Sequence, residues 1–285
     1  MSTQPTPQPP LGPEAIASWN ANAAYWDAAI TKDGNKYWRR LQEPCLTRFL
    51  GPFLSSGGRV LDLATGNGLC ARWLADKLQE SGGEPGEVVA ADASEGMLEV
   101  AKGYGDREGR IKFRRVDVTS EEELRGLQEE EGRFGVVLMN MAIMDVAELG
   151  PLAKALRELL VPGGVFVATL LHPVFFTSNA SRIVEVSYNP MTGDQEIVRG
   201  KLVKEYMSVP PAKGIAIPGQ PAKQLYIHRP IQDVFSPFFK AGLVMDAMEE
   251  LAFTTEAAEP NRIESTANYT QLPAILAFRM RLPKN

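Results

Sequence analysis

Two carboxylates and a glycine turn carry the clearest chemical signal in this sequence. Asp62 lies in the apolar run Val60–Leu63, and the turn Gly66-Asn67-Gly68 begins four residues after it. Because glycine lacks a Cβ atom, the backbone can turn sharply there and a ligand can lie against it. The helical pattern that starts at Leu69 would present free N–H groups and the positive end of its dipole to that ligand. The spacing therefore predicts a strand, a turn and a helix that bind a nucleotide-like molecule.

The second carboxylate, Asp92, ends a predicted buried strand and lies 26 residues beyond Gly66. In nucleotide-binding βαβ units, an acidic residue at about this distance accepts hydrogen bonds from a ribose. The glycine turn also satisfies the dinucleotide pattern G-x-G-x-x-G/A through Ala71, so an NAD(P)-dependent oxidoreductase is an alternative. A dinucleotide-binding strand is usually apolar where this one carries Asp62, which favours a different ligand.

These motifs resemble those of the class I S-adenosylmethionine (SAM)-dependent methyltransferases. The run VLDLATGNG is similar to the family's first motif, VLDxGxGxG, with Ala64 in place of the first glycine. The runs ADASEGML and LVPGGVF resemble the family's D-x-S-x-x-M-L and L-x-P-G-G-x-F. The resemblance, strongest over residues 14–164, implies a methyltransferase that uses SAM, releases S-adenosylhomocysteine (SAH) and acts on a small molecule. A SAM-binding protein that does not transfer a methyl group is a further alternative.

The resemblance assigns residues to each part of the cofactor. Asp92 would accept hydrogen bonds from both ribose hydroxyls, Asp117 would accept from the adenine amine, and the next backbone N–H would meet the ring. Tyr25 would turn its aromatic face toward the sulfonium cation, an attractive arrangement. Asn140 and Met141, directly after a predicted strand, would contact the methionine part. The predicted SAM-binding residues are Tyr25, Asp62, Ala64, Thr65, Gly66, Asn67, Gly68, Asp92, Ala93, Met97, Asp117, Val118, Asn140 and Met141.

A methyl acceptor must be positioned, and a hydroxyl acceptor must also lose a proton. His172 follows a predicted strand and titrates near neutrality, so we predict it as the general base and as an acceptor contact. A structural histidine at a hinge is the alternative. Trp26, Asp145 and His228 are the other predicted acceptor contacts, although Asp145 would also suit the cap of a short turn. No spacing of Cys, His, Asp or Glu suggests a metal site.

Strands and helices must alternate to bring these side chains together. Sequence patterns predict strands at Val60–Leu63, Glu87–Ala91, Ile111–Val116, Phe134–Met139, Val165–Leu171, Leu243–Glu249 and Ala274–Arg281. With helices between the first five, this pattern predicts an α/β fold with a doubly wound, mostly parallel, Rossmann-like sheet. The resemblance implies seven strands in that sheet, of which the last runs antiparallel.

The remaining segments predict additions to this core. Residues 1–13, rich in Pro, Gln and Thr, are expected to form a disordered tail. An N-terminal helical cap over residues 14–55 would include a helix from Tyr37 to Phe49, broken by Pro44. The SAM-binding core is predicted over residues 56–171 and its C-terminal part over 230–285.

An insertion lies between these two parts, over residues 172–229. Strand-like runs at Arg182–Tyr188, Glu196–Tyr206 and Gln224–His228 predict a small β lid over the acceptor. A loop of this length is usually functional or disordered. A plain surface insertion or a dimer-forming one is the alternative.

Composition narrows the class of partner. The 285 residues carry a net charge of −5 without a Lys/Arg stripe, which disfavours nucleic acid and anionic membranes. No run approaches the ~18 apolar residues of a membrane-spanning helix, and the N-terminus lacks a signal pattern. Two cysteines without metal-like spacing suit a reducing compartment. We therefore expect a cytoplasmic enzyme, monomeric or homodimeric, with a small organic substrate and a slight preference for O-methylation.

Overall fold

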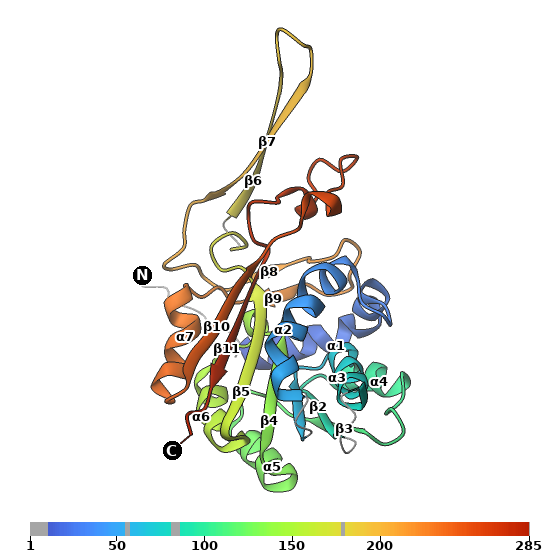
Figure 1. Cartoon of the computed structure of the whole chain (residues 1–285), viewed down its shortest axis with the longest axis vertical. Helices are drawn as coiled ribbons and strands as arrows, with labels where there is room; N and C mark the ends of the chain where they lie inside the picture. Colours follow the sequence, from blue (N-terminus) through green and yellow to red (C-terminus); the bar gives the residue numbers. More distant parts are fainter. Residues whose placement is uncertain (1–10, 55–57, 81–85, 178–179, 285) are drawn as a thin grey trace, which may run out of the picture.

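A computed structural model describes residues 11–54, 58–80, 86–177 and 180–284. Within these ranges seven strands form one sheet, in the order β10-β11-β5-β4-β1-β2-β3 (Figure 1). The strands are β1 (Val60–Leu63), β2 (Val88–Asp92), β3 (Ile111–Arg115), β4 (Phe134–Asn140), β5 (Leu160–Leu171), β10 (Val244–Leu251) and β11 (Ile275–Arg281). The first five run parallel, and β11 lies antiparallel between β5 and β10. The predicted doubly wound sheet with an antiparallel last strand is confirmed.

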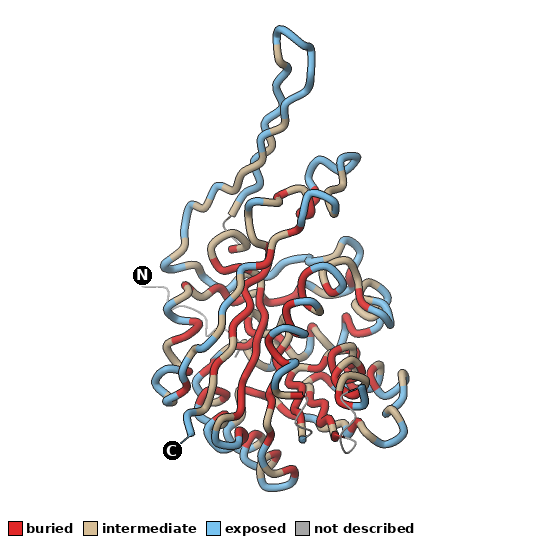
Figure 2. Tube along the Cα trace, viewed as in Figure 1, coloured by how far each residue is buried: buried red, intermediate tan, exposed pale blue. Residues whose placement is uncertain are grey.

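Helices cover both faces of the sheet. They are α1 (Leu11–Ile30), α2 (Glu43–Leu54), α3 (Leu69–Glu80), α4 (Glu95–Gly103), α5 (Glu121–Glu131), α6 (Gly150–Leu159) and α7 (Ile231–Lys240). Alternate residues of the central strands join two separate apolar clusters, so that Leu61 packs with α6 and α7 while Val60 packs with α2 and α3. Figure 2 shows that buried residues, drawn in red, are concentrated along these strands. The polar ends of the strands are therefore held at fixed positions by a core on each side.

The N-terminal region differs from the sequence prediction in two places. Residues 11–13 begin α1 and do not belong to a disordered tail, while residues 1–10 lie outside the described part of the chain. Pro44 does not break the second helical segment, which continues through a π-helical turn (Trp38–Gln42) and α2 to Leu54. Pro44 comes directly after the π-helical turn, in which the Glu43 N–H bonds to the carbonyl of Trp38, so the proline falls where the regular α-helical hydrogen-bond pattern is already interrupted.

The insertion contains two separate hairpins. Strands β6 (Ala180–Tyr188) and β7 (Gln195–Val203) form a long hairpin that projects from the body of the molecule (Figure 1). The short strands β8 (Ala212–Gly214) and β9 (Gln224–Tyr226) form the second hairpin. It lies against the body, because Ile227 donates a backbone hydrogen bond of 2.8 Å to Met144. Sequence patterns indicated β6, β7 and β9 but not β8. None of the helices described is long and apolar enough to cross a membrane.

Candidate functional site

The turn after β1 has three left-handed residues in alternation. Ala64, Gly66 and Gly68 have φ angles of 54°, 56° and 75°. A Cβ atom built on Gly68 would lie 3.0 Å from the Cβ of Ala101 in α4, so this glycine is needed for close packing. A Cβ atom on Gly66 would meet no atom within 4 Å. The turn therefore offers its backbone at Gly66 to open space, where a ligand can approach it.

Asp92 links the ends of β1 and β2. Its Oδ2 atom accepts a 2.8 Å hydrogen bond from the Gly66 N–H, and its Oδ1 atom accepts one of 2.8 Å from Ser94 N–H. Ser94, not Asp92, caps α4 by accepting from the N–H of Met97, a buried residue in the first turn. Burial raises the pKa of Asp92, while these backbone donors lower it. Each carboxylate oxygen retains acceptor capacity, because it has two lone-pair directions.

Asp62 lies on β1, between β4 and β2, and is buried with one oxygen atom unsatisfied. The side chain is 1% exposed, and its Oδ2 atom accepts a 2.5 Å hydrogen bond from the Thr65 hydroxyl. The Oδ1 atom has no partner among the described residues. Burial, with a smaller contribution from the charge of Asp92, raises the pKa of Asp62 to about 7, while the Thr65 hydroxyl and the nearby Ala71 N–H lower it. An unpaired buried carboxylate oxygen is costly, so this atom is suited to a cationic or hydrogen-bonding ligand group.

Asp117 follows β3 at the same edge of the sheet. Its Oδ1 atom accepts hydrogen bonds of 2.8 Å from the N–H and 2.7 Å from the hydroxyl of Thr119. Ser120 caps α5 by accepting from Glu123 N–H, so Asp117 is not the helix cap. Val118 lies buried beside it, and Ala93 follows Asp92 directly at the end of β2. The predicted residues after β1, β2 and β3 are thus brought to one edge.

The end of β4 is held rigidly. Asn140 donates a 2.9 Å hydrogen bond from Nδ2 to Gln42 Oε1, and its Oδ1 atom accepts one of 2.6 Å from the Thr169 hydroxyl. Met141 then adopts a φ angle of 55°, and its N–H is bonded to Thr169. Left-handed backbone at a residue with a side chain is strained, and such strain gathers at functional sites.

Helix α1 contacts the glycine turn and the start of α4 through two polar side chains that sequence reasoning missed. Asp27 Oδ1 accepts a 2.9 Å hydrogen bond from Asn67 Nδ2. Asn20 Oδ1 accepts from the Ser94 hydroxyl at 2.7 Å and from the N–H of Gly96 at 3.0 Å. The two residues are seven positions apart and so share one face of the helix. The spacing of these two polar residues could have indicated a shared contact, but the prediction for this helix relied on its aromatic residues.

Two of those aromatic residues, Tyr25 and Trp26, take different positions. The Tyr25 hydroxyl donates to the backbone carbonyl of Pro218 in the insertion. The indole of Trp26 packs on Trp19 with ring centroids 5.2 Å apart, and its buried Nε1 atom has no partner among the described residues. Tyr25 therefore joins the cap to the insertion, whereas Trp26 leaves a hydrogen-bond donor free.

His172 has no free ring nitrogen. Its Nδ1 atom accepts a 3.2 Å hydrogen bond from the N–H of Val174, which places the proton on Nε2 for donation to Glu250 Oε1 at 2.8 Å. Burial lowers the pKa of the 1% exposed side chain, against the raising effect of Glu250. This geometry ties the end of β5 to β10, and does not support the predicted role of His172 as a general base.

Asp145 is the last residue of the helical turn η2 (Ile143–Asp145), which follows β4. Its carboxylate accepts no hydrogen bond from the residues described, and it does not cap the turn. Burial raises the pKa of Asp145 well above its ordinary value. Burial, and then the negative charge of Asp145, raise the pKa of Tyr226, whose hydroxyl donates at 2.9 Å to the carbonyl of Phe176. The turn therefore holds a carboxylate that can accept a proton, or a hydrogen bond from a ligand.

His228 is buried close to this turn. Its neighbour Arg229 donates to the carbonyls of Ile143, Val146 and Ala147, which fixes the segment against η2. The Nε2 atom of His228 donates at 2.7 Å to the carbonyl of Tyr206. The Nδ1 atom has no partner among the described residues. Unlike His172, this side chain keeps a free acceptor.

The fold and the strand-end carboxylates define a nucleotide-binding Rossmann-like protein, and comparison with known proteins narrows the class. Residues 60–164 match the family model described as a methyltransferase domain. The chain is 32% identical over 181 residues to the ubiquinone biosynthesis O-methyltransferase of Roseobacter denitrificans. It is 35% identical over 121 residues to the demethylmenaquinone methyltransferase of Clavibacter sepedonicus. These matches cover 58% and 42% of this chain, and 66% and 43% of the two relatives.

Solved structures agree on the fold. An S-adenosylmethionine-dependent methyltransferase from Mesorhizobium loti matches 88% of this chain and 100% of its own with a TM-score of 0.58 and 22% identity. A SAM-dependent methyltransferase from Aquifex aeolicus matches 90% of this chain and 97% of its own with a TM-score of 0.51 and 13% identity. The chain belongs to the class I SAM-dependent methyltransferases.

Proposed function

We propose that this protein transfers a methyl group from SAM to a small organic acceptor, with an acceptor hydroxyl favoured over nitrogen or carbon. The relatives that support this proposal include a ubiquinone biosynthesis O-methyltransferase and a demethylmenaquinone methyltransferase. Neither the comparisons nor the site favours the NAD(P)-dependent alternative, since a buried acid occupies the strand before the glycine turn.

The single observation that carries the proposal is the unsatisfied Oδ1 atom of Asp62 beside the open turn at Gly66. SAM carries an α-ammonium group, a ribose with two hydroxyls and a sulfonium whose methyl group is the electrophile. Asp62 would hold the ammonium, and the remaining lone pairs of Asp92 would accept from the ribose hydroxyls. Asp117 would accept from the adenine amine. Each of these groups lies at the carboxyl ends of parallel strands, where open α/β sheets bind ligands.

For the acceptor we propose Asp145 as the group that takes the hydroxyl proton. Both ring nitrogens of His172 are occupied by hydrogen bonds, whereas the Asp145 carboxylate has no partner among the described residues. A carboxylate with a raised pKa is a stronger base than an ordinary one, which improves proton transfer near neutral pH. Trp26 and His228, each with one unpaired nitrogen, would contact the acceptor.

Calorimetric titration tests the cofactor assignment directly, with SAM, SAH and NADH compared on the same preparation. We expect SAM and SAH to bind and NADH to give no heat. Binding of NADH without binding of SAM would contradict the proposal. Binding of SAM without methyl transfer to any member of a broad panel of phenols, amines and enols would instead identify a SAM-binding protein without this activity.

A further inference from the structure

The base of the β6–β7 hairpin holds two positive charges that have no acidic partner in the part of the chain that the structure describes. Arg182 and Lys201 are direct cross-strand partners, so their side chains share one face of the hairpin. Within the described residues no carboxylate lies within 4 Å of either side chain. Lys201 is half-buried, and burial, with a smaller contribution from Arg182, lowers its pKa to about 8. A desolvated cation without an acid nearby is expensive, and proteins usually pair one.

The surroundings of Lys201 are aromatic. Its Nζ atom lies 4.1 Å from the ring centroid of Phe176 and 5.6 Å from that of Tyr269. Tyr269 is only 3% exposed, yet its hydroxyl has no hydrogen-bond partner among the described residues. A buried hydroxyl normally finds a partner. An anion between Lys201 and Tyr269 would satisfy both groups, and a ring attached to it would have the Phe176 side chain to pack on.

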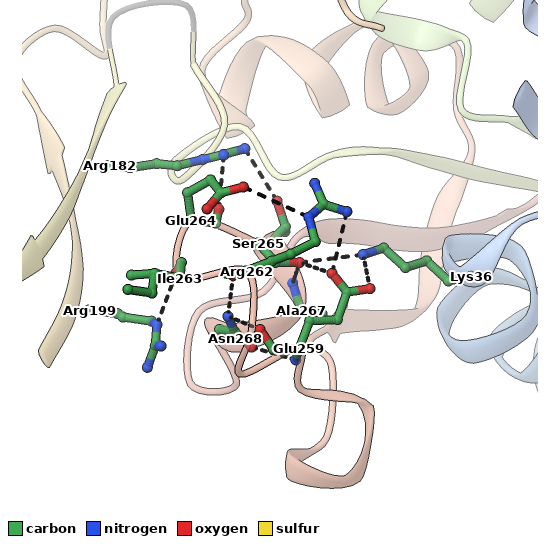
Figure 3. A network of polar contacts seen from close by, with 11 residues as sticks. Lys36, Arg182, Arg199, Glu259, Arg262, Ile263, Glu264, Ser265, Ala267 and Asn268 are labelled. Carbon is green, nitrogen blue, oxygen red and sulfur yellow. Dashed lines mark hydrogen bonds and ion pairs between the residues drawn. The ribbon is translucent and has the colours of Figure 1, made fainter. Parts of the chain in front are cut away.

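Hydrogen bonds to a neighbouring loop hold this face of the hairpin in place. Arg182 donates at 3.0 Å to the carbonyl of Glu264, and Arg199 donates to the carbonyl of Ile263 (Figure 3). The loop itself is anchored to the cap by the 2.7 Å ion pair between Glu259 and Lys36 (Figure 3). The two arginines therefore bind carbonyl groups of the loop, and their positive charges are not neutralised there.

Phe176 connects these charges to the proposed chemistry. Its side chain packs on the same apolar cluster as Met141, at the end of β4. Its carbonyl accepts from Tyr226, the tyrosine whose pKa Asp145 raises. We propose that Lys201, with Arg182 and the Tyr269 hydroxyl, binds the carboxylate of a small aromatic acid, and that this acid is the methyl acceptor. Its identity as the acceptor, though not the anion site itself, rests on the function proposed above.

The test uses the full-length protein saturated with SAH, whose own binding heat checks the proposed function separately. Benzoate, phenylacetate, cinnamate and 4-hydroxybenzoate are titrated calorimetrically at constant ionic strength, each beside its neutral amide. We expect at least one acid to bind at least tenfold more tightly than its amide. SAH binding together with no preference for any acid over its amide would overturn the anion site and leave the cofactor assignment intact.

Substitutions test whether Lys201 supplies the positive charge that binds the acid. Lys201→Met should lower the affinity for the preferred acid at least tenfold while leaving its amide unaffected, and Lys201→Arg should restore part of the loss. Tyr269→Phe removes only the hydroxyl and should weaken acid binding several-fold. The matched control is Lys204→Met, because Lys204 is an exposed lysine just beyond β7. Equal losses in Lys201→Met and Lys204→Met would indicate general attraction to positive charge and overturn the site.

Discussion

The carboxylate of Asp92 accepts a 2.8 Å hydrogen bond from the backbone N–H of Gly66, which joins the end of β2 to the glycine turn after β1. The two residues are 26 positions apart in the sequence, yet the parallel pairing of β1 with β2 brings them together. The acid therefore has two functions in this structure. It orders the turn through this bond, and each of its oxygen atoms keeps capacity to accept a further hydrogen bond.

The first prediction concerns Asp92. Asp92→Ala should reduce SAM affinity at least tenfold, because both the ribose acceptor and the bond that orders the Gly66 turn are lost. Each hydrogen bond to a charged group contributes about 1.5–3 kcal/mol. Calorimetric titration with SAM measures the change, and circular dichroism checks that the variant is folded. The control is Asp106→Ala, an exposed aspartate outside the site; an unchanged affinity in Asp92→Ala would remove this residue from the pocket.

The second prediction concerns the pH dependence of SAM binding through Asp62. Its pKa of about 7 in the free protein should fall when an ammonium group binds. Because binding then favours the ionised acid, SAM affinity should fall as the pH is lowered below 7. The decrease should approach tenfold per pH unit until the pH reaches the pKa of the bound state. Titrations between pH 5 and pH 7 measure this slope, which Asp62→Asn should abolish along with most of the affinity.

The raised pKa of Asp62 also implies that this residue, although it favours SAM binding, lowers the stability of the folded protein at neutral pH. The folded protein holds the Asp62 proton more tightly than the unfolded chain does, so ionisation near neutral pH opposes folding. Asp62→Asn should therefore raise the free energy of unfolding at pH 8 by up to about 4 kcal/mol, since the pKa rises from 3.8 to about 7 and one pKa unit corresponds to about 1.4 kcal/mol. Urea denaturation at pH 8 and pH 5 checks this. A gain that is equally large at both pH values would contradict the mechanism.

The third prediction concerns Ala64, which stands where the resembled motif has glycine. A left-handed conformation costs a residue with a Cβ about 1–2 kcal/mol, and glycine's larger loss of freedom on folding offsets about 0.5–1 kcal/mol of that. Ala64→Gly should therefore raise Tm slightly, by about 2 °C, with SAM affinity retained. Ala17→Gly, at an exposed position inside α1, should instead lower Tm. A lower Tm in both variants would mean that Ala64 is not strained.

Sequence reasoning succeeded where local pattern determines structure. Every strand of the sheet overlaps a range predicted from the sequence, and Asp62, Asp92 and Asp117 meet at one edge because parallel strands align their carboxyl ends. Sequence patterns do not reveal side-chain contacts between segments that lie far apart in the chain. Nothing local to His172 reveals that Glu250, 78 residues later, occupies its Nε2 atom. The contacts of α1 with the turn through Asp27 depend likewise on docking between distant segments.

The fourth prediction concerns His172 and acid sensitivity. Burial lowers the pKa of this side chain in the folded protein, so the unfolded chain takes up its proton first as the pH falls. The stability that His172 contributes is present above its unfolded pKa of about 6.5 and is lost as the pH falls toward the folded value. His172→Gln should therefore show a smaller decrease in Tm between pH 7.5 and pH 5.5 than the wild type.

A substitution of Glu250 provides a matched test of how the pKa of His172 affects stability. Its carboxylate opposes the effect of burial by raising the pKa of His172. Glu250→Gln keeps the shape of the side chain but removes that charge, so its Tm should fall more steeply on acidification than that of the wild type. Thermal melts at several pH values distinguish the variants. A profile no steeper than that of the wild type would contradict the raising effect of Glu250 on the pKa of His172.

The fifth prediction separates the two candidates for proton removal. With a hydroxylated aromatic acid that binds and is turned over, Asp145→Asn should lower kcat at least 100-fold and change SAM affinity less than twofold, since general base catalysis contributes about 10²–10⁴-fold. His172→Gln should lower kcat less than tenfold, because neither ring nitrogen is free to accept a proton. Stopped assays that follow SAH formation against pH measure both effects.

The pH profile decides between a chemical and a structural role for Asp145. Because burial raises its pKa, the wild-type rate should rise with pH through that raised value as the carboxylate becomes ionised. Asp145→Glu restores a carboxylate on a longer side chain and should recover part of the rate with a similar profile, which a purely structural role would not produce. If Asp145→Asn retained most of the rate while His172→Gln lost it, the proton would pass to His172, and the Glu250 bond would have to open during catalysis.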